Sequence, residues 1–333
     1  MSTLLVTGGA GYVGSHAVVE LLARGHKVVV LDNLNQGHQE AVSAEAIFVR
    51  GDLADRRALV AVFKAHRFDA IMHFAAHSLV GESMTKPLRY VGENVVNALN
   101  LIEAAVENKV RKFVQSSTCA IFGTPERVPI DEEVAKAPVN PYGDGKLAIE
   151  RILHWADQAH SLRSACLRYF NAAGAHPTAD IGEDHSPETH LIPIALDVAL
   201  GKRAHIDVYG TDYPTPDGTC VRDYIHVCDL ADAHVRVLDA LDERSRRYNV
   251  GIGRGYSVRE VLASVRRVTG TKVTERVAPR RAGDPPVLVA KPDLIRRELG
   301  WQPRFTEIDQ IVATAWQWRR AHPHGFGAAL AAD

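Results

Sequence analysis

Short apolar runs rich in β-branched residues alternate with helix-length amphipathic segments through the first half of the chain. Runs of this length bounded by turn residues predict buried strands, and the periodic segments between them predict helices. The predicted strands are residues 4–6, 28–31, 47–49, 70–73, 113–115 and 165–169. This alternation predicts an α/β fold with a doubly wound, Rossmann-like parallel sheet, whose ligands bind beyond the carboxyl ends of the strands.

Two longer segments, 83–108 and 141–160, carry apolar residues at helical spacing. These apolar residues are Val91, Val95, Leu99, Ile102, Leu147, Ile152, Leu153 and Trp155. Two such helices side by side can form the seam of a homodimer, which we expect, but they can also simply pack on the sheet. Periodicity alone does not separate these arrangements.

The pattern changes after Asn171, where loops rich in Gly, Pro, Asp and His replace the regular alternation. We predict a larger N-terminal domain over 1–170 and a smaller C-terminal substrate lobe over 171–224 and 256–326. Residues 225–241 and 248–251 resemble one more helix and strand, so 225–255 is expected to return to the sheet. Past residue 257 we expect a mixed helical region, and then a poorly ordered tail at 327–333.

Composition excludes several classes of partner. The 333 residues carry 39 basic and 40 acidic side chains, a net charge of -1, so no long-range field attracts nucleic acid or an anionic membrane. Four scattered cysteines, the lack of a leader-like segment and the lack of a long apolar run lead us to expect a cytoplasmic protein with reduced thiols. The sixteen histidines include no His-x-x-x-His with a supporting carboxylate, so no metal site is expected.

A glycine-rich turn, Thr7-Gly-Gly-Ala-Gly-Tyr-Val-Gly14, joins the first predicted strand to a predicted helix. The spacing of its glycines allows a tight turn and brings the helix N-terminus onto a pyrophosphate. Asp32 ends the second strand, where its carboxylate can accept hydrogen bonds from both hydroxyls of the adenosine ribose. A 2'-phosphate would meet this negative charge, so the pattern predicts NAD, with a loop or capping role for Asp32 as the alternative.

Polar or small residues also end the next three predicted strands. Asp52 can contact the adenine or serve an ordinary turn. The small residues of His73-Phe-Ala-Ala76 suit a backbone that passes close to a cofactor, although a tight core turn explains them as well. Ser116-Ser-Thr118 places hydroxyls where one can hydrogen-bond a reacting oxygen, unless the strand merely ends in a loop there.

Tyr142 and Lys146 stand four residues apart behind the helix-opening pair Asn140-Pro141. At this spacing their side chains share a helical face. A cation about 4 to 5 Å from the phenol is worth roughly 4 kcal/mol at an effective dielectric of about 20, or about 3 pKa units downward. The phenol would then be a usable base near neutral pH. Such a pair also arises by chance, so alone it is weak evidence.

Arg222 and Arg281 are isolated guanidinium groups in loops of the predicted substrate lobe. Guanidinium groups bind phosphate oxygens through two parallel hydrogen bonds. We predict that they hold a diphosphate, with surface salt bridges to Asp223 and Asp284 as the alternative.

Together these residues resemble the extended short-chain dehydrogenase/reductases, and among them the UDP-glucose 4-epimerase (UDP-galactose 4-epimerase) family. The similarity runs from Leu4 to Phe326, nearly the full chain. Its most specific segments are 7–16, 81–83, 142–146, 168–171, 174–177, 210–226 and 278–284.

The resemblance implies tightly held NAD and interconversion of UDP-glucose and UDP-galactose. Tyr142 would remove the O4 proton while hydride moves from C4 to NAD, and the 4-keto sugar would rotate and take hydride back on its other face. The catalytic set it implies is Thr118, Tyr142 and Lys146. The predicted cofactor contacts are Gly8, Gly11, Tyr12, Val13, Gly14, Asp32, Asn33, Asp52, Leu53, Phe74, Ala75, Ala76, Asn94, Ser116, Tyr142, Lys146 and Tyr169. The predicted substrate contacts are Ser78, Thr118, Tyr142, Asn171, His190, Leu191, Arg222, Arg281, Asp284 and Leu288.

The sequence departs from the family pattern at several of these positions. Many members have Tyr-Gly-Lys-Ser-Lys where this chain has Tyr142-Gly-Asp144-Gly145-Lys146, and Asp144 can compete for Lys146. Ser78 and His190 stand where some members carry lysine and asparagine. Leu288 matches a position that limits the size of the sugar, so we hypothesise good turnover of UDP-glucose and UDP-galactose and poor turnover of N-acetylated sugars.

Other functions remain open at this level. An epimerase of other UDP-sugars, pentoses or uronic acids has the same motifs. A 4,6-dehydratase of the superfamily carries acidic residues after its active threonine, where this chain has Cys119 and Ala120. A non-catalytic nucleotide sensor would not need Thr118, Tyr142 and Lys146 together.

Overall fold

A seven-stranded parallel sheet forms the centre of the N-terminal region in the computed structural model, which describes residues 1–281 and 283–327. Its strand order is β10-β6-β5-β4-β1-β2-β3. The strands are β1 (Thr3–Thr7), β2 (Lys27–Asp32), β3 (Ile47–Arg50), β4 (Ala70–His73), β5 (Lys112–Thr118), β6 (Arg163–Tyr169) and β10 (Arg246–Val250). All six strands predicted from the sequence fall within these bounds, and the doubly wound fold is confirmed.

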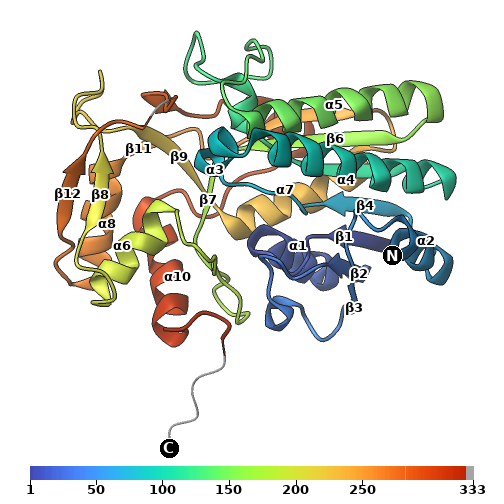
Figure 1. Cartoon of the computed structure of the whole chain (residues 1–333), viewed down its shortest axis with the longest axis horizontal. Coiled ribbons are helices and arrows are strands. Elements are labelled where there is room, and N and C mark those ends of the chain that lie inside the picture. Colours follow the sequence, from blue (N-terminus) through green and yellow to red (C-terminus); the bar gives the residue numbers. More distant parts are fainter. Residues whose placement is uncertain (282, 328–333) are drawn as a thin grey trace, which may run out of the picture.

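Helices cover both faces of this sheet, so its strands are apolar along their whole length. Leu4 and Val6 of β1 point into one core and Leu5 into the other, as alternation along a strand requires. The first core lies under α1 (Tyr12–Ala23), α7 (Val227–Ala240) and α9 (Asp293–Leu299). The second lies under α2 (Arg56–Ala65), α4 (Pro87–Glu107) and α5 (Pro141–His160), of which α4 and α5 run along the upper side in Figure 1.

The direction of winding reverses between β1 and β4. From β1 the chain builds outward through β2 to β3, and from β4 it builds outward through β5 to β6 on the other side. The carboxyl ends of adjacent strands diverge at such a reversal and leave a crevice for ligands. The glycine-rich turn after β1 and the loop after β4 both lie at this place.

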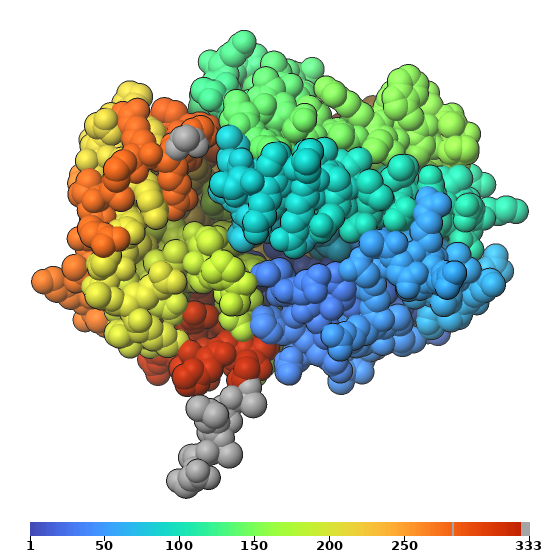
Figure 2. Space-filling view, in the orientation of Figure 1, coloured from blue at the N-terminus to red at the C-terminus, as the bar shows by residue number. Residues whose placement is uncertain are grey.

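A second region is built around two smaller sheets. β7 (Asn171–Ala173), β9 (Val221–His226), β11 (Gly255–Ser257) and β13 (Val287–Leu288) form one, and β8 (Ile206–Tyr209) pairs with β12 (Glu275–Ala278) in the other. α6 (Leu191–Ala199), α8 (Val258–Thr269) and α10 (Ile308–Ala321) enclose a third core with them. Figure 2 shows the yellow-to-red surface of this region beside the blue-to-green surface of the N-terminal half.

Several predicted elements differ from those observed. The segment 83–108 is not one helix, because Pro87 starts α4 and Lys86 separates it from α3 (Val80–Thr85). The region past residue 257 contains β12 and β13 as well as helices. Two short 3-10 helices, η1 (Gln39–Ala41) and η2 (Cys119–Phe122), complete the elements. The predicted tail at 327–333 lies, except for Gly327, outside the described residues.

The division into two domains stays a prediction. Of the segment 225–255, which was predicted to return to the large sheet, β10 lies at one end of that sheet. β9, just before α7, instead pairs with strands of the second region. No helix among the described residues is long and apolar enough to cross a membrane. All four cysteines are buried free thiols.

Candidate active site

The glycine-rich turn packs closely against the loop after β4. Gly8 has a φ of +75°, in the left-handed region, and a Cβ there would lie 2.4 Å from the backbone nitrogen of Ala75. A Cβ on Gly14 would lie 2.1 Å from the carbonyl oxygen of Gly8. Gly11 is the N-cap of α1 and offers no side chain to the amides of the first turn. These amides and the close backbone approach fit a pyrophosphate.

Asp32 fastens this turn to the end of β2. Its Oδ2 accepts a hydrogen bond from the amide of Ala10 at 3.0 Å and its Oδ1 accepts one from the amide of Leu34 at 2.9 Å. The loop role left open by the sequence is therefore present, but each carboxylate oxygen has a second acceptor site for a ribose hydroxyl. Next to it, Asn33 Nδ2 donates to Asp52 Oδ2 at 2.8 Å, so two predicted cofactor residues contact each other.

The loop after β4 is held from two sides. The amides of Phe74 and Ala75 donate to the carbonyl oxygen of Thr7 at 2.8 and 3.1 Å, which ties the ends of β4 and β1 together. From α4, Asn94 Oδ1 accepts from the amide of His77 at 2.8 Å, and its Nδ2 donates to the carbonyl oxygen of His77 at 3.0 Å. Asn94 thus positions the loop that borders the predicted cofactor site.

Tyr142 and Lys146 lie on the face of α5 that meets the end of β5. Both are buried, and Lys146 Nζ donates to the carbonyl oxygen of Ser116 at 2.8 Å. The same Nζ lies 5.9 Å from the centre of the Tyr142 ring. The hydroxyl of Ser116 is 2.8 Å from the hydroxyl of Tyr169 on β6. The structure therefore brings four residues predicted from the sequence into one polar cluster.

The electrostatics of this cluster differ from the prediction. Burial raises the pKa of Tyr142 well above its usual value, and Tyr169 adds to this, while a hydrogen bond with Thr118 lowers it. Burial also lowers the pKa of Lys146 to about 8. The expected lowering of the pKa of Tyr142 by Lys146 is wrong for the protein's own side chains, because the ammonium donates to Ser116 and burial disfavours the phenolate.

A buried ion pair extends the same face of α5 by one turn. Glu150 accepts from Ser117 Oγ at 2.6 Å and from Arg168 Nη2 of β6 at 2.6 Å, and the side chains of Glu150 and Arg168 are 4% and 5% exposed. Hydrogen bonds from Arg168 and Ser117 outweigh burial and lower the pKa of Glu150. The sequence analysis missed Glu150, although its place four residues after Lys146 was a signal for it.

Comparison with known proteins gives the family. A sequence model of the NAD dependent epimerase/dehydratase family matches residues 4–251. The chain belongs to this family. It is 51% identical over 327 residues to the UDP-glucose 4-epimerase of Lacticaseibacillus casei, which covers 98% of this chain and 99% of that protein. These matches confirm the resemblance inferred from the motifs.

Solved structures of UDP-glucose 4-epimerases have the same fold. One is 51% identical, with a TM-score of 0.95, and the match covers 98% of this chain and 100% of that one. Another, from Bifidobacterium longum in complex with NAD+ and UDP, is 38% identical with a TM-score of 0.94, covering 97% and 100%. The NAD dependence of the epimerase/dehydratase family confirms the predicted cofactor.

In this member of the epimerase/dehydratase family, the two arginines predicted to bind a diphosphate have different surroundings. Arg222 forms an ion pair with Asp284, but its side chain is only 12% exposed, so the pair is not the surface salt bridge considered above. Arg281 is exposed and its guanidinium lies 4.0 Å from the centre of the Tyr209 ring. Leu288 pairs in register with Arg222. Leu288 thus lies beside one predicted substrate residue.

The remaining predicted residues lie in several helices, loops and strands. Asp144 is exposed while Lys146 is buried, and no ion pair joins them within 1–281 and 283–327. Asp144 therefore does not compete with Tyr142 for the ammonium of Lys146. His190 Nδ1 lies 2.9 Å from Glu183 Oε1, so a carboxylate already occupies this nitrogen. The others are Tyr12 and Val13 in the first turn of α1, Leu53 in the core under α2, Ala76 and Ser78 after β4, Asn171 in β7 and Leu191 in α6.

We predict that Glu150→Gln destabilises the protein by about 3 kcal/mol, because it leaves the charge of Arg168 buried without a counter-ion. Chemical denaturation of the two proteins measures this difference. Because the folded-state pKa of Glu150 is lowered, its contribution is present above the unfolded pKa and is lost as the pH falls through the folded value. The difference between the two proteins should therefore shrink in acid.

Glu103→Gln is the matched control, since Glu103 pairs with Arg56 on the surface with side chains 44% and 64% exposed. It should cost less than about 1 kcal/mol. Equal losses in the two variants would contradict a special role for the buried pair.

Proposed function

We propose that the protein interconverts UDP-glucose and UDP-galactose by transient oxidation at C4 with bound NAD. The observation that carries this is the cluster of Tyr142, Lys146 and Ser116 at the carboxyl end of β5. It lies in the sheet whose first turn is shaped for a dinucleotide. The family to which the chain belongs and its relatives named UDP-glucose 4-epimerase support the same activity.

The residues around the glycine-rich turn fit NAD. Side chains on Gly8 or Gly14 would clash with the backbone of Ala75 or of Gly8, so these glycines permit the tight turn that brings the first amides of α1 to a pyrophosphate. Asp32 would hold the adenosine ribose with its free acceptor sites, and Asn94 would hold the loop after β4 in place. When bound, NAD supplies a hydride acceptor at C4 of the sugar and a positive charge near the phenol.

Tyr142 would take the proton from the O4 hydroxyl, and Thr118 would hydrogen-bond the same oxygen. Burial alone keeps Tyr142 protonated, so a nearby positive charge is needed to release its proton. Lys146 contributes through its ammonium, which has a pKa of about 8 and is charged at neutral pH. Its bond to the carbonyl oxygen of Ser116 fixes the ammonium on the face of α5 that carries the phenol.

The diphosphate would be held from the second region. Arg222 is kept in place by Asp284 and by the carbonyl oxygen of Val221, to which its Nη1 donates at 2.8 Å. Arg281 would approach from the loop after β12. Holding the uridine diphosphate while leaving the hexose free allows the 4-keto sugar to turn its other face to the cofactor. The alternative is the same chemistry on another UDP-sugar, and less favoured is a non-catalytic nucleotide sensor.

We also propose a homodimer formed through α4 and α5. Val91, Val96 and Leu99 of α4 leave apolar surface exposed, and Trp155 of α5 is 68% exposed. Ile102 and Leu153 from the predicted seam are instead buried against the sheet. The exposed residues therefore remain as the candidate seam.

Incubation of the purified protein with UDP-galactose, without added cofactor, should yield UDP-glucose. Tyr142→Phe should lower kcat/KM by about 10²–10⁴-fold, because the general base is lost while the binding contacts remain. Tyr248→Phe is the matched control, since Tyr248 lies on the edge strand β10 and its hydroxyl donates to Glu298 of α9, and this variant should keep the activity. A protein that neither contains nor takes up NAD, or a Tyr142→Phe variant of normal activity, would contradict the proposal.

The sugar restriction is tested by comparing UDP-glucose with UDP-N-acetylglucosamine. We expect kcat/KM to be at least about tenfold lower for the N-acetylated sugar, because Leu288, which belongs to one small core with Cys119 and Phe170, would limit the space for the sugar. Leu288→Ala should reduce the difference in kcat/KM between the two substrates. Comparable turnover of both by the wild type would show that Leu288 does not select the sugar.

The dimer is tested by light scattering on the wild type and on Trp155→Glu. A charge in the seam should shift the protein to monomers. Val60→Glu is the matched control, because Val60 is also exposed but lies on α2. A monomeric wild type, or a Trp155→Glu variant that stays dimeric, would refute this arrangement.

A further inference from the structure

Four potential metal-binding side chains converge in the loop between β7 and α6. Glu183, His185, Glu188 and His190 each offer one ligand atom, and these atoms all lie within 4.8 Å of one another. All four come from one stretch of eight residues, Glu-x-His-x-x-Glu-x-His. The sequence analysis searched for His-x-x-x-His and therefore expected no metal site.

The distances between these atoms match those in a tetrahedral coordination shell. Nδ1 of His190 lies 2.9 Å from Oε1 of Glu183 and 3.0 Å from Oε1 of Glu188. Nδ1 of His185 lies 3.3 Å from Oε1 of Glu183 and 3.7 Å from Oε2 of Glu188. Ligands of a four-coordinate zinc ion, each about 2.0–2.2 Å from the metal, lie about 3.3 Å from one another.

Two of these atoms lack hydrogen-bond partners among the described residues. Nδ1 of His185 and Oε2 of Glu188 are buried and accept or donate no hydrogen bond there. The Glu188 side chain is only 5% exposed, so this oxygen points into the cluster and not into solvent. A buried carboxylate oxygen without a partner is costly, and a cation among the four ligand atoms would satisfy it.

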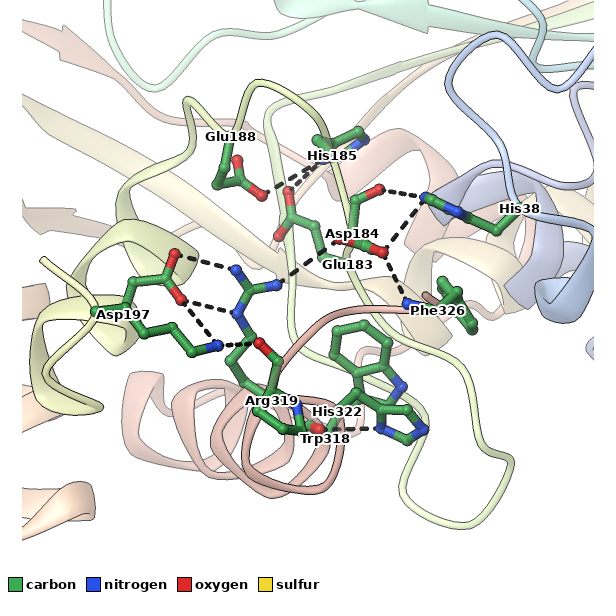
Figure 3. Close-up of polar contacts among 12 residues, drawn as sticks. His38, Glu183, Asp184, His185, Glu188, Asp197, Trp318, Arg319, His322 and Phe326 are labelled. Atoms are coloured by element: carbon green, nitrogen blue, oxygen red, sulfur yellow. Dashed lines mark hydrogen bonds and ion pairs between the residues drawn. The ribbon is translucent and has the colours of Figure 1, made fainter. Parts of the chain in front are cut away.

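Arg319, whose charge acts on Glu188 at longer range, makes its hydrogen bonds elsewhere. Arg319 donates to both carboxylate oxygens of Asp197 at 2.9 and 3.0 Å and also faces Asp184, as Figure 3 shows. His38 contacts the backbone oxygen of Asp184, on the side away from Glu188 in the same view. Two carboxylates and two neutral imidazoles would therefore be balanced by one divalent cation.

We propose that these four side chains bind one divalent first-row transition-metal ion, with Zn²⁺ as the expected occupant. Imidazole together with carboxylate ligands suits such ions, whereas an oxygen-only shell would suit Mg²⁺ or Ca²⁺. The site uses no residue of the Tyr142 cluster and is structural. It fixes the loop next to Tyr12 of the glycine-rich turn, whose ring centre lies 6.2 Å from that of His185.

Two protons can occupy the same ligand atoms in place of a cation. Burial lowers the pKa of His185, but the adjacent carboxylates of Glu183 and Glu188 raise it to about 9. The cluster would then be a pair of imidazolium–carboxylate contacts without a metal. The two states differ in metal content and in response to Zn²⁺.

The test is metal analysis of the full-length protein after chelation, dialysis and addition of Zn²⁺ or Mg²⁺. We expect one Zn²⁺ per chain to remain through gel filtration, a Zn²⁺-dependent rise in melting temperature, and neither effect with Mg²⁺. Glu188→Gln and His185→Asn should each weaken Zn²⁺ binding by at least about 100-fold. Asp180→Asn is the matched control, because it removes an exposed carboxylate from the same loop and no ligand.

Co²⁺ provides a measurement that does not depend on a variant. Tetrahedral Co²⁺ gives a strong visible absorption, which should appear at one equivalent and disappear when Zn²⁺ is added. Circular dichroism of both variants shows whether they are folded. Absence of stoichiometric Zn²⁺ and of the Co²⁺ band in the wild type, or unchanged binding in folded Glu188→Gln, would overturn the proposal in favour of the two-proton state.

Discussion

The candidate site depends on how one face of α5 meets the carboxyl ends of β5 and β6. Tyr142, Lys146 and Glu150 occur at intervals of four residues, so they lie in a row on this face. Lys146 is fixed by the carbonyl oxygen of Ser116, and Glu150 by the guanidinium of Arg168. These bonds set the rotation of the helix about its axis, and that rotation decides where the phenol points.

The energetic cost of this arrangement is the burial of charge. The charges of Glu150 and Arg168 compensate each other. Removing one of them leaves the other charge buried without a partner, at the full cost of its desolvation. Lys146 has no carboxylate partner among the described residues, and burial lowers its pKa as a result. At the carboxyl end of β5, the ammonium of Lys146 is thus stabilised by a backbone carbonyl group and not by a carboxylate. Its positive charge can therefore stabilise a nearby phenolate.

Sequence patterns were sufficient for the sheet and for placing Tyr142 and Lys146 on one face of a helix, for a physical reason. A strand buried on both faces must be apolar throughout, and the Tyr142 and Lys146 pair follows from helical periodicity, so both are local features of the chain. The break at Pro87 was also visible, and the single helix predicted there was an error of interpretation.

Properties that depend on tertiary contacts were not accessible in the same way. The pKa of Tyr142 is governed by burial, which spacing along a helix does not report. Arg168 is paired with a residue 18 positions away, and Arg222 with one 62 positions away. The cluster of Glu183 and His190 lies within one loop, yet only the folded loop turns its side chains toward each other.

The pairing of Arg222 with Asp284 bears on how a nearly neutral chain can bind a diphosphate. A free guanidinium would lose side-chain entropy on binding, whereas Arg222 is already held by Asp284 and by the carbonyl oxygen of Val221. The carboxylate weakens the local positive potential, but Arg281 has no carboxylate partner among the described residues and adds a second cation from a neighbouring loop. In the proposed diphosphate site, a pre-organised Arg222 and an exposed Arg281 would together replace the long-range attraction that a net charge of -1 cannot provide.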